Sequence, residues 1–592
     1  MSTHEDRLRA LRAQLARQKL DGFVVPLTDE HLSEYVGAYA QRLAWLTGFL
    51  GSAGSAVVLP EEAAIFTDGR YTLQVRDQVD GAHWQFESVP QTSVAAWLGD
   101  HAPAGGRIGY DPWLHTRRWV EDATSTLAKK GAVLVPVESN PVDAVWDDRP
   151  HPSKARLIPH EDRYAGRSSA AKRADMANWM KVQDVDATVL TALDSIAWTF
   201  NIRGADVTHT PVALAYALLH ADGKAEVFVD PAKIDADVRA HLGNAVTLLD
   251  RAEFITALGG LTGKTVAVDP DRAVSAIFEA LDNAGATIKP LRDPAVLPKA
   301  VKNETEITGH KAAQARDGAA MAKFLHWLSI EGPKGGQTEI SVSDRLQAFR
   351  EETGALVDLS FDTISGSGPN GAIVHYKASA ETCRPVESGT LLLVDSGGQY
   401  RDGTTDITRT MAIGTPSDEM RHRFTLVLKG HIALACARFP AGTRGSQLDV
   451  LARQFLWAEA LDYAHGTGHG VGSFLSVHEG PQRIATASGD EPLQPGMILS
   501  NEPGYYKTGA YGIRIENLVL VVESGTGEND RPWYAFETLS HTPIDRALIE
   551  VEALTQAERD WVNAYHARTL EIVGPQLEGE DKAWLEAACA PL

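Results

Sequence analysis

Two aspartates in the middle of the chain have the spacing of a paired metal site. Asp395 directly follows the apolar run at 391–394, and Asp406 comes next within VDSGGQYRDGTTD. A hairpin turning at Tyr400 and Arg401 would place the two carboxylates directly opposite each other, with Cβ atoms about 5 Å apart. Carboxylates that close repel, and a divalent cation between them removes the repulsion. We therefore predict two metal ligands here; unrelated acids on a solvated hairpin are the alternative.

A second acidic pair, Glu502 and Glu516, follows further along the chain. The two residues bracket a hairpin predicted around Gly509, which again places them opposite each other. Glu516 lies between Ile515 and an apolar run, where a carboxylate without a partner is costly. A bound cation would remove that cost. Arg514 points to the same face as Glu516 and would remove it equally well as an ion-pair partner, so both explanations stay open.

The glycine-rich segment HGTGHG at 465–470 supplies a histidine for the same site. Glycines let the backbone approach a bound group closely. His469 is the better candidate for a fifth metal ligand. His465, His478 and His375 then become candidates for groups that support the ligands or transfer protons.

The five ligands define a chemistry. Two Asp, two Glu and one His form an oxygen-rich set that favours Mn²⁺-like ions over thiolate-bound zinc. Four carboxylates neutralise two dications, and two such ions about 3.5–4 Å apart can activate a shared water. The predicted reaction is metal-assisted hydrolysis. An incidental cluster of polar residues is the alternative.

The elements that must position these residues fall into three predicted domains. The first 140 residues alternate strands and helices, and Pro- and Asp-rich breaks follow near 140–154 and 289–303. LAW at 43–45 recurs as IAW at 196–198, and YDP at 110–112 recurs as VDP at 268–270, which indicates two copies of one α/β domain. We expect domains at 1–140, 155–290 and 300–592. The third begins with a helix capped by Asn303 and Glu306 and ended by Gly332-Pro333.

Composition limits the partners and the compartment. Lys plus Arg number 56 and Asp plus Glu number 78, for a formal charge of −22 among 592 residues. Such a charge argues against binding to nucleic acid or to an anionic membrane. Three widely spaced cysteines predict neither a disulfide framework nor a cysteine zinc site, which fits a reducing compartment. With no apolar signal segment and no long apolar run, a cytoplasmic location is expected.

The amino-acid sequences of four motifs also resemble those of a known family. GPNGAIVHY, VDSGGQYRDGTTDITRT, LDYAHGTGHGVGSFLSVHEGP and NEPGYYKTGAYGIRIEN resemble the pita-bread metallopeptidase family, most closely its cytosolic-type three-domain Xaa-Pro aminopeptidases (aminopeptidase P). GSAGSAVVL and FTDGRYTLQ resemble the creatinase-type N-terminal domain, and TALDSIAWTFNIRGADVTHTPV resembles a second copy of it. The implied fold class is α/β (α+β), with two creatinase-like domains before a pita-bread catalytic domain.

The resemblance implies a role for each metal ligand. Asp395 would bind one ion, His469 and Glu502 the other, and Asp406 and Glu516 would bridge the two. The ions, most simply Mn²⁺, would hold a hydroxide that attacks the N-terminal Xaa-Pro bond of a peptide.

It also implies roles for residues around the ions. His375 and His478 would hold the scissile bond and stabilise the oxyanion, His465 would line the proline pocket, and Glu502 would move a proton.

Three further residues match positions that contact substrate or support such contacts in related enzymes. Tyr506 and Arg514 match pocket and supporting positions. Arg70 in DGRY would lie at the entrance to the active site or support a dimer, with a structural salt bridge as the alternative. The family suggests a homodimer that acts on peptides with proline in second place.

Two other functions remain compatible with the same motifs. A prolidase has this fold and these ligands but cleaves Xaa-Pro dipeptides. A non-catalytic pita-bread module binds protein and typically lacks the ligands, all five of which are present here. Hydrolysis of a tripeptide compared with a dipeptide distinguishes the two enzymes.

Overall fold

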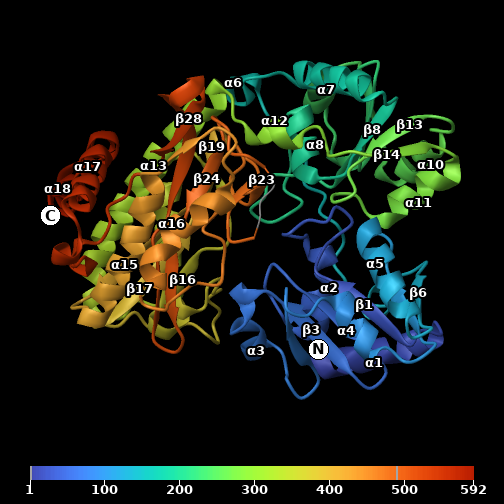
Figure 1. Cartoon of the computed structure of the whole chain (residues 1–592), viewed down its shortest axis with the longest axis horizontal. Helices are drawn as coiled ribbons and strands as arrows, with labels where there is room; N and C mark the ends of the chain where they lie inside the picture. Colours follow the sequence, from blue (N-terminus) through green and yellow to red (C-terminus); the bar gives the residue numbers. More distant parts are fainter. Residues whose placement is uncertain (1–2, 488–490) are drawn as a thin grey trace. The chain divides into compact units, whose positions relative to one another are not determined.

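The computed structural model describes residues 3–487 and 491–592 (Figure 1). The chain divides into two compact units. The first contains the residues up to Asp162 together with Arg167–Val296, and the second contains Arg163–Gly166 and Leu297–Leu592. Both are built from helices and strands together, as the motif pattern predicts.

The first unit contains two six-stranded sheets with equivalent topology. Their orders are β4-β3-β2-β1-β5-β6 and β12-β11-β10-β8-β13-β14. In each sheet a central strand has an antiparallel neighbour on one side and a parallel neighbour on the other, β1 between β2 and β5 and β8 between β10 and β13. The strand bounds are β1 Gly22–Pro26, β2 Ser55–Val58, β3 Ala63–Thr67, β4 Gln85–Ser88, β5 Arg107–Tyr110, β6 Val133–Pro136, β8 Ala187–Leu190, β10 Ala215–His220, β11 Ala225–Val229, β12 Val246–Leu249, β13 Thr265–Val268 and β14 Thr287–Pro290.

Helices bury one face of each of these sheets. Trp97 of α4 packs with Phe66 of the first sheet, and Phe254 of α10 packs with Phe228 of the second. The helix bounds are α1 His4–Arg17, α2 Arg42–Thr47, α3 Gln74–Gln78, α4 Val94–His101, α5 Arg117–Ala128, α7 Ser169–Gln183, α8 Leu193–Phe200, α9 Ala236–Leu242, α10 Phe254–Gly259 and α11 Ser275–Ala284. The two halves join through an ion pair between Glu30 and Arg251 at 2.5 Å.

A long helix, α13 (Glu304–Glu331), opens the second unit. Asn303 and Glu306 form the expected capping box at its start, and the helix ends before Pro333, as predicted. The C-terminal helices α17 (Gln556–Val573) and α18 (Gly579–Ala588) pack along α13 (Figure 1). The other helices of the second unit are α12 Val296–Ala300, α14 Glu339–Glu351, α15 Asp418–Ala435 and α16 Gly445–Trp457.

The sheets of the second unit carry the predicted ligands. The orders are β16-β17-β20, β15-β18-β19, β21-β28-β27-β24-β22-β23, and the pair β25-β26. The strand bounds are β15 Leu356–Leu359, β16 Ile364–Ser367, β17 Thr390–Ser396, β18 Gly398–Tyr400, β19 Gly403–Thr404, β20 Ile407–Ile413, β21 Arg438–Pro440, β22 Gly468–Gly470, β23 Glu479–Ile484, β24 Ile498–Asn501, β25 Gly504–Lys507, β26 Tyr511–Arg514, β27 Asn517–Thr526 and β28 Pro532–Thr538.

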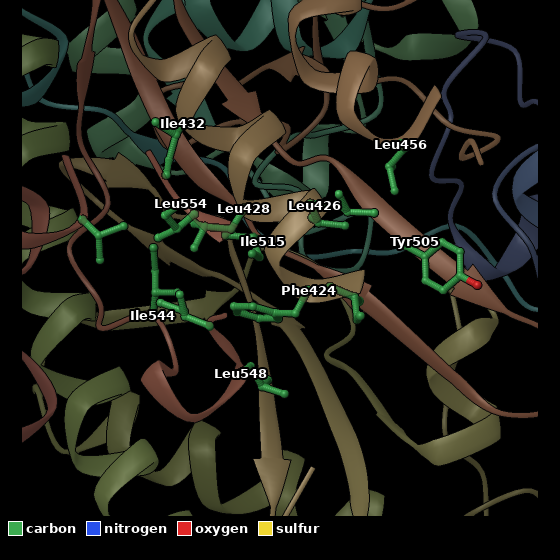
Figure 2. Close-up of a cluster of buried hydrophobic side chains, with 14 of the residues drawn as sticks. Phe424, Leu426, Leu428, Ile432, Leu456, Tyr505, Ile515, Ile544, Leu548 and Leu554 are labelled. Carbon is green, nitrogen blue, oxygen red and sulfur yellow. The ribbon is translucent and has the colours of Figure 1, made fainter. Parts of the chain in front are cut away.

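An apolar core lies beneath these sheets. Figure 2 shows Phe424 and Leu428 of α15 beside Ile515, which directly precedes Glu516, and Ile544 and Leu548 complete the group. All five side chains are buried. Close packing on one side of Ile515 fixes the short connection between β26 and β27 from which the neighbouring glutamate projects.

The cysteines and the helices bear on two expectations drawn from composition. Cys383, Cys436 and Cys589 are all free thiols. Over 3–487 and 491–592, none of the helices combines the length and hydropathy that crossing a membrane requires.

Candidate metal centre

The aspartate pair lies on one hairpin, but the two residues do not face each other directly. β17 pairs with β20 so that Asp395 faces Thr408. Tyr400 pairs with Gly403, so the turn lies one residue later than we predicted from the sequence. The predicted direct opposition is therefore wrong by two residues. Since side chains alternate along a strand, a shift of two keeps Asp406 on the same face as Asp395, in a diagonal position.

Burial of Tyr400 explains the difference in register. Its ring is fully buried and its hydroxyl donates to Asp317 Oδ1 at 2.7 Å. A side chain held that way belongs to a strand and not to an exposed turn. The turn therefore consists of the next two residues, Arg401 and Asp402.

The glutamate pair has the predicted register. β25 pairs with β26 with Gly504 opposite Arg514, and β24 pairs with β27 with Asn501 opposite Asn517. Glu502 and Glu516 lie between these two ladders, at positions that the same register places opposite each other. The second hairpin therefore agrees with the sequence-based expectation.

Three of the five predicted ligands meet closely enough to share a metal ion. Ligand atoms of Asp406, His469 and Glu516 all lie within 4.8 Å of one another. His469 Nε2 is 3.4 Å from Asp406 Oδ2 and 3.6 Å from Glu502 Oε1. Glu516 and Asp395 are buried, and Asp395 Oδ1 has no hydrogen-bond partner in the described chain.

The electrostatics of the cluster favour a bound dication. Burial, together with the Asp406 and Asp395 carboxylates, raises the pKa of Glu516 well above its ordinary value. Burial raises the pKa of Glu502 to about 6, against the opposing charges of His469 and Arg514. Such carboxylates repel one another in a low-dielectric site. A divalent ion coordinated by them offsets both the burial cost and the repulsion, so the donor set fits divalent metal ions.

Arg514 pairs with Asp395 and not with Glu516. Its Nη2 donates to Asp395 Oδ2 at 2.7 Å, and Nη1 donates to the Tyr506 hydroxyl at 2.6 Å. The sequence left open an Arg514–Glu516 ion pair as an explanation for the buried glutamate. The structure gives Glu516 a hydroxyl donor instead, so its charge is left for a cation.

The predicted histidines surround the carboxylates. The ring of His478 lies 4.3 Å from that of His469. His465 carries its proton on Nδ1, because that atom lies 2.8 Å from the Gly466 carbonyl, and its Nε2 accepts from the Tyr506 hydroxyl at 2.8 Å. The carbonyl of Val374, directly before His375, accepts from Arg514 Nη2 at 3.3 Å. Their catalytic roles remain predictions.

Sequence reasoning missed two hydroxyls that hold the glutamates. Thr408 Oγ1 donates to Glu516 Oε2 at 2.7 Å, and Ser500 Oγ donates to Glu502 Oε1 at 3.0 Å. Thr408 lies two residues after Asp406 and Ser500 two residues before Glu502. The period of a β-strand therefore puts each hydroxyl on the ligand face, a signal that was available in the sequence.

Arg70 belongs to the first unit. Its guanidinium donates to Asp68 Oδ2 at 2.8 Å and lies 3.6 Å from Glu34. This pairing is the salt bridge that we considered as the alternative to an entrance residue. The substrate role of Arg70 remains a prediction.

Comparison with known proteins identifies the class. The model of metallopeptidase family M24 matches residues 308–523, and a model of the C-terminal region of that peptidase family matches 532–592. Models of the creatinase/prolidase N-terminal domain match both 7–145 and 148–306. The chain belongs to metallopeptidase family M24, with two creatinase-type N-terminal domains before the pita-bread domain.

Similar proteins of this family extend over nearly the whole chain. A probable Xaa-Pro aminopeptidase P of Laccaria bicolor is 41% identical and covers 99% of this chain and 93% of its own length. Aminopeptidase P2 of Arabidopsis thaliana is 41% identical, with 97% and 86% covered. The X-prolyl aminopeptidase of Caenorhabditis elegans, described as a cytosolic enzyme with a di-nuclear active site, has a TM-score of 0.95 at 34% identity over all of both chains.

Proposed function

We propose that this protein is an aminopeptidase that removes the first residue of peptides whose second residue is proline, with two divalent metal ions. The observation that carries the proposal is the cluster of Asp406, His469 and Glu516, with Asp395 and Glu502 close enough to raise the pKa of Glu516. Relatives about 40% identical over nearly the full length have this activity in their names. The substrates that follow are short peptides of the form Xaa-Pro-Yaa.

We assign the ions to Asp395, Asp406, His469, Glu502 and Glu516. When bound, the two ions polarise the peptide carbonyl and lower the pKa of water. Mn²⁺ is the proposed metal because the donors are four carboxylates and one imidazole. A di-nuclear active site in the C. elegans enzyme supports two ions.

The chain prepares its ligands with hydrogen bonds. His469 Nδ1 donates to the Gly470 carbonyl at 2.8 Å, which leaves the Nε2 lone pair for a metal. Thr408 and Ser500 fix the orientations of Glu516 and Glu502. Arg514 holds Asp395 from the other side.

Substrate recognition is proposed for the surrounding side chains. A bond to proline is a tertiary amide without an N–H, so its pocket needs no acceptor at that nitrogen. The linked Arg514, Tyr506 and His465 are proposed to line this pocket, and His375 and His478 to hold the scissile carbonyl as charge develops. Glu502 is proposed to move the proton.

We further propose a cytoplasmic homodimer with no nucleic-acid or membrane partner. The C. elegans relative is described as cytosolic, and the formal charge of −22 disfavours polyanionic partners. The domain limits 1–140, 155–290 and 300–592 are part of this proposal.

Hydrolysis of two matched peptides tests the activity. The protein is stripped with chelator, reloaded with Mn²⁺, and assayed with Arg-Pro-Pro and Arg-Pro. We expect metal-dependent release of Arg from the tripeptide only. Cleavage of the dipeptide alone would assign a prolidase, and no cleavage of either would support a binding module. Asp395→Asn should abolish activity, whereas Asp402→Asn, in the turn of the same hairpin, should retain it.

A further inference from the structure

A cavity in the second unit, apart from the candidate metal centre, has the composition of a ligand site. It measures about 470 Å³ and is lined by residues of α13, α17 and the end of β28. Cavities of about 300–1,000 Å³ are typical of small-molecule sites. None of the five predicted metal ligands lines it. We propose that this cavity binds a small carboxylate with a flat apolar body.

His541 lines this cavity, and its ring nitrogens have no hydrogen-bond partner among the described residues. Only 7% of its surface is exposed, and its Nδ1 is buried without a hydrogen-bond partner. Nε2 makes no hydrogen bond within residues 3–487 and 491–592 either, but unlike Nδ1 it is not enclosed by protein. Buried polar atoms are nearly always paired in folded proteins. A ligand oxygen in the cavity would supply a partner for Nε2, because Nδ1 is enclosed by protein.

The charges around the cavity favour an anion. Lys311 and Arg568 lie at its edge, paired with the half-exposed or exposed carboxylates of Glu537 at 2.8 Å and Glu571 at 2.6 Å. Exposed pairs of this kind contribute little, so a ligand carboxylate can replace one of them at small cost.

A buried cation lies behind the cavity wall. Arg409 donates to the Tyr565 hydroxyl at 2.8 Å and otherwise to carbonyls and to Asn517. Among the described residues it forms no ion pair, and the Glu516 carboxylate acts on it from a longer distance. Burial, Arg568 and Arg409 lower the pKa of His541 to about 4, so the ring is neutral and can donate one N–H. A monoanion therefore suits the cavity, while Glu537 at the edge opposes a more highly charged group.

Aromatic rings define the body of the ligand. Trp561 and Tyr565 stack with centroids 5.4 Å apart and planes 1° from parallel, and His541 stacks on Tyr565 at 6.2 Å. Leu539 and Ile572 complete the apolar lining. Such a surface favours a flat ring and does not itself require a hydrogen bond. The combined chemistry is that of an aryl alkanoate.

Calorimetric titration of the metal-loaded protein tests the site. Indole-3-propionate is the probe, and its uncharged amide is the matched control ligand. We expect saturable binding of one probe per chain, and about fivefold weaker binding of the amide because it lacks the charge that Arg568 attracts.

Three variants assign the binding to this cavity. Arg568→Gln should weaken the carboxylate probe about fivefold, whereas Arg559→Gln, on the same helix but outside the cavity, should leave it unchanged. His541→Phe keeps a flat ring and removes both nitrogens, so it should weaken binding about tenfold while the midpoint of thermal unfolding stays at or above the original.

Two results would overturn the proposal. One is the absence of saturable binding at millimolar probe. The other is binding that neither Arg568→Gln nor His541→Phe weakens and that a peptide substrate displaces, because such a probe would occupy the metal centre. This experiment does not depend on the proposed peptidase activity.

Discussion

Thr408 offers the sharpest test of how the chain holds its metal ions. Its hydroxyl donates to Glu516 Oε2 at 2.7 Å and accepts from Arg514 Nε at 3.2 Å, in a fully buried setting. Thr408→Val keeps the shape and removes the hydroxyl. A hydrogen bond to a charged acceptor contributes about 1.5–3 kcal/mol, which corresponds to about 10–150-fold in an equilibrium constant. We expect Mn²⁺ affinity to fall by that factor.

Titration of the stripped protein with Mn²⁺ measures this loss directly. Thr408→Ser is the matched control, because it keeps the hydroxyl and removes only a methyl group. We expect its affinity to remain within a few-fold of the original protein. Equal Mn²⁺ affinities for the valine and serine variants would refute the argument that this hydroxyl orients Glu516. Circular dichroism of both stripped variants should show the same fold, since Thr408 lies within a complete strand ladder.

Three further outcomes follow from other contacts, two at the candidate metal centre and one in the first unit. In metal-free protein burial raises the pKa of Glu502 to about 6, so its carboxyl holds a proton more tightly in the folded than in the unfolded state, and the thermal stability of the original protein relative to Glu502→Gln should fall as pH rises from about 5 to 7; a relative rise over this window, measured by calorimetry on both proteins, would contradict the assignment. Asp206→Asn leaves the Lys233 ammonium buried and unpaired, and should lower the free energy of unfolding by about 3–5 kcal/mol, measured by denaturant titration. Tyr506→Phe removes an acceptor of Arg514 and should lower kcat/KM for Arg-Pro-Pro about 5–100-fold at unchanged metal content; loss of metal instead would place Tyr506 among the groups that hold the ions.

Residue type and strand period were enough to select candidate ligands that the structure brings close together, and the resemblance of the motifs to a known family supplied the fold class. Acids at the ends of buried strands and a histidine among glycines are local signals that one sequence contains. The capped helix from Glu304 to Glu331 was predictable for the same reason, since Asn303, Glu306 and Pro333 act within a few residues.

Contacts between distant segments were not predictable. Tyr400 is fixed in its strand by Asp317, far away in the sequence, and this contact decides where the first hairpin turns. Arg514 forms its ion pair with Asp395 and not with Glu516, which is nearer in the sequence, because packing brings β26 beside β17. A single sequence does not show which distant residues contact each other, so the strand register and the ion pair could be determined only from the structure.

The candidate ligands come together despite the wrong register because a metal site depends first on which face a side chain occupies. A shift of two residues moves Asp406 along the ladder but leaves it on the same face as Asp395 and Thr408. A shift of one would have turned Asp406 away from the glutamates. Inserting one residue in the turn at Arg401 and Asp402 should therefore abolish metal binding if it changes the pairing of β20, whereas a two-residue insertion should be tolerated. Equal metal content in the two variants would show that the turn absorbs the added chain without changing the pairing.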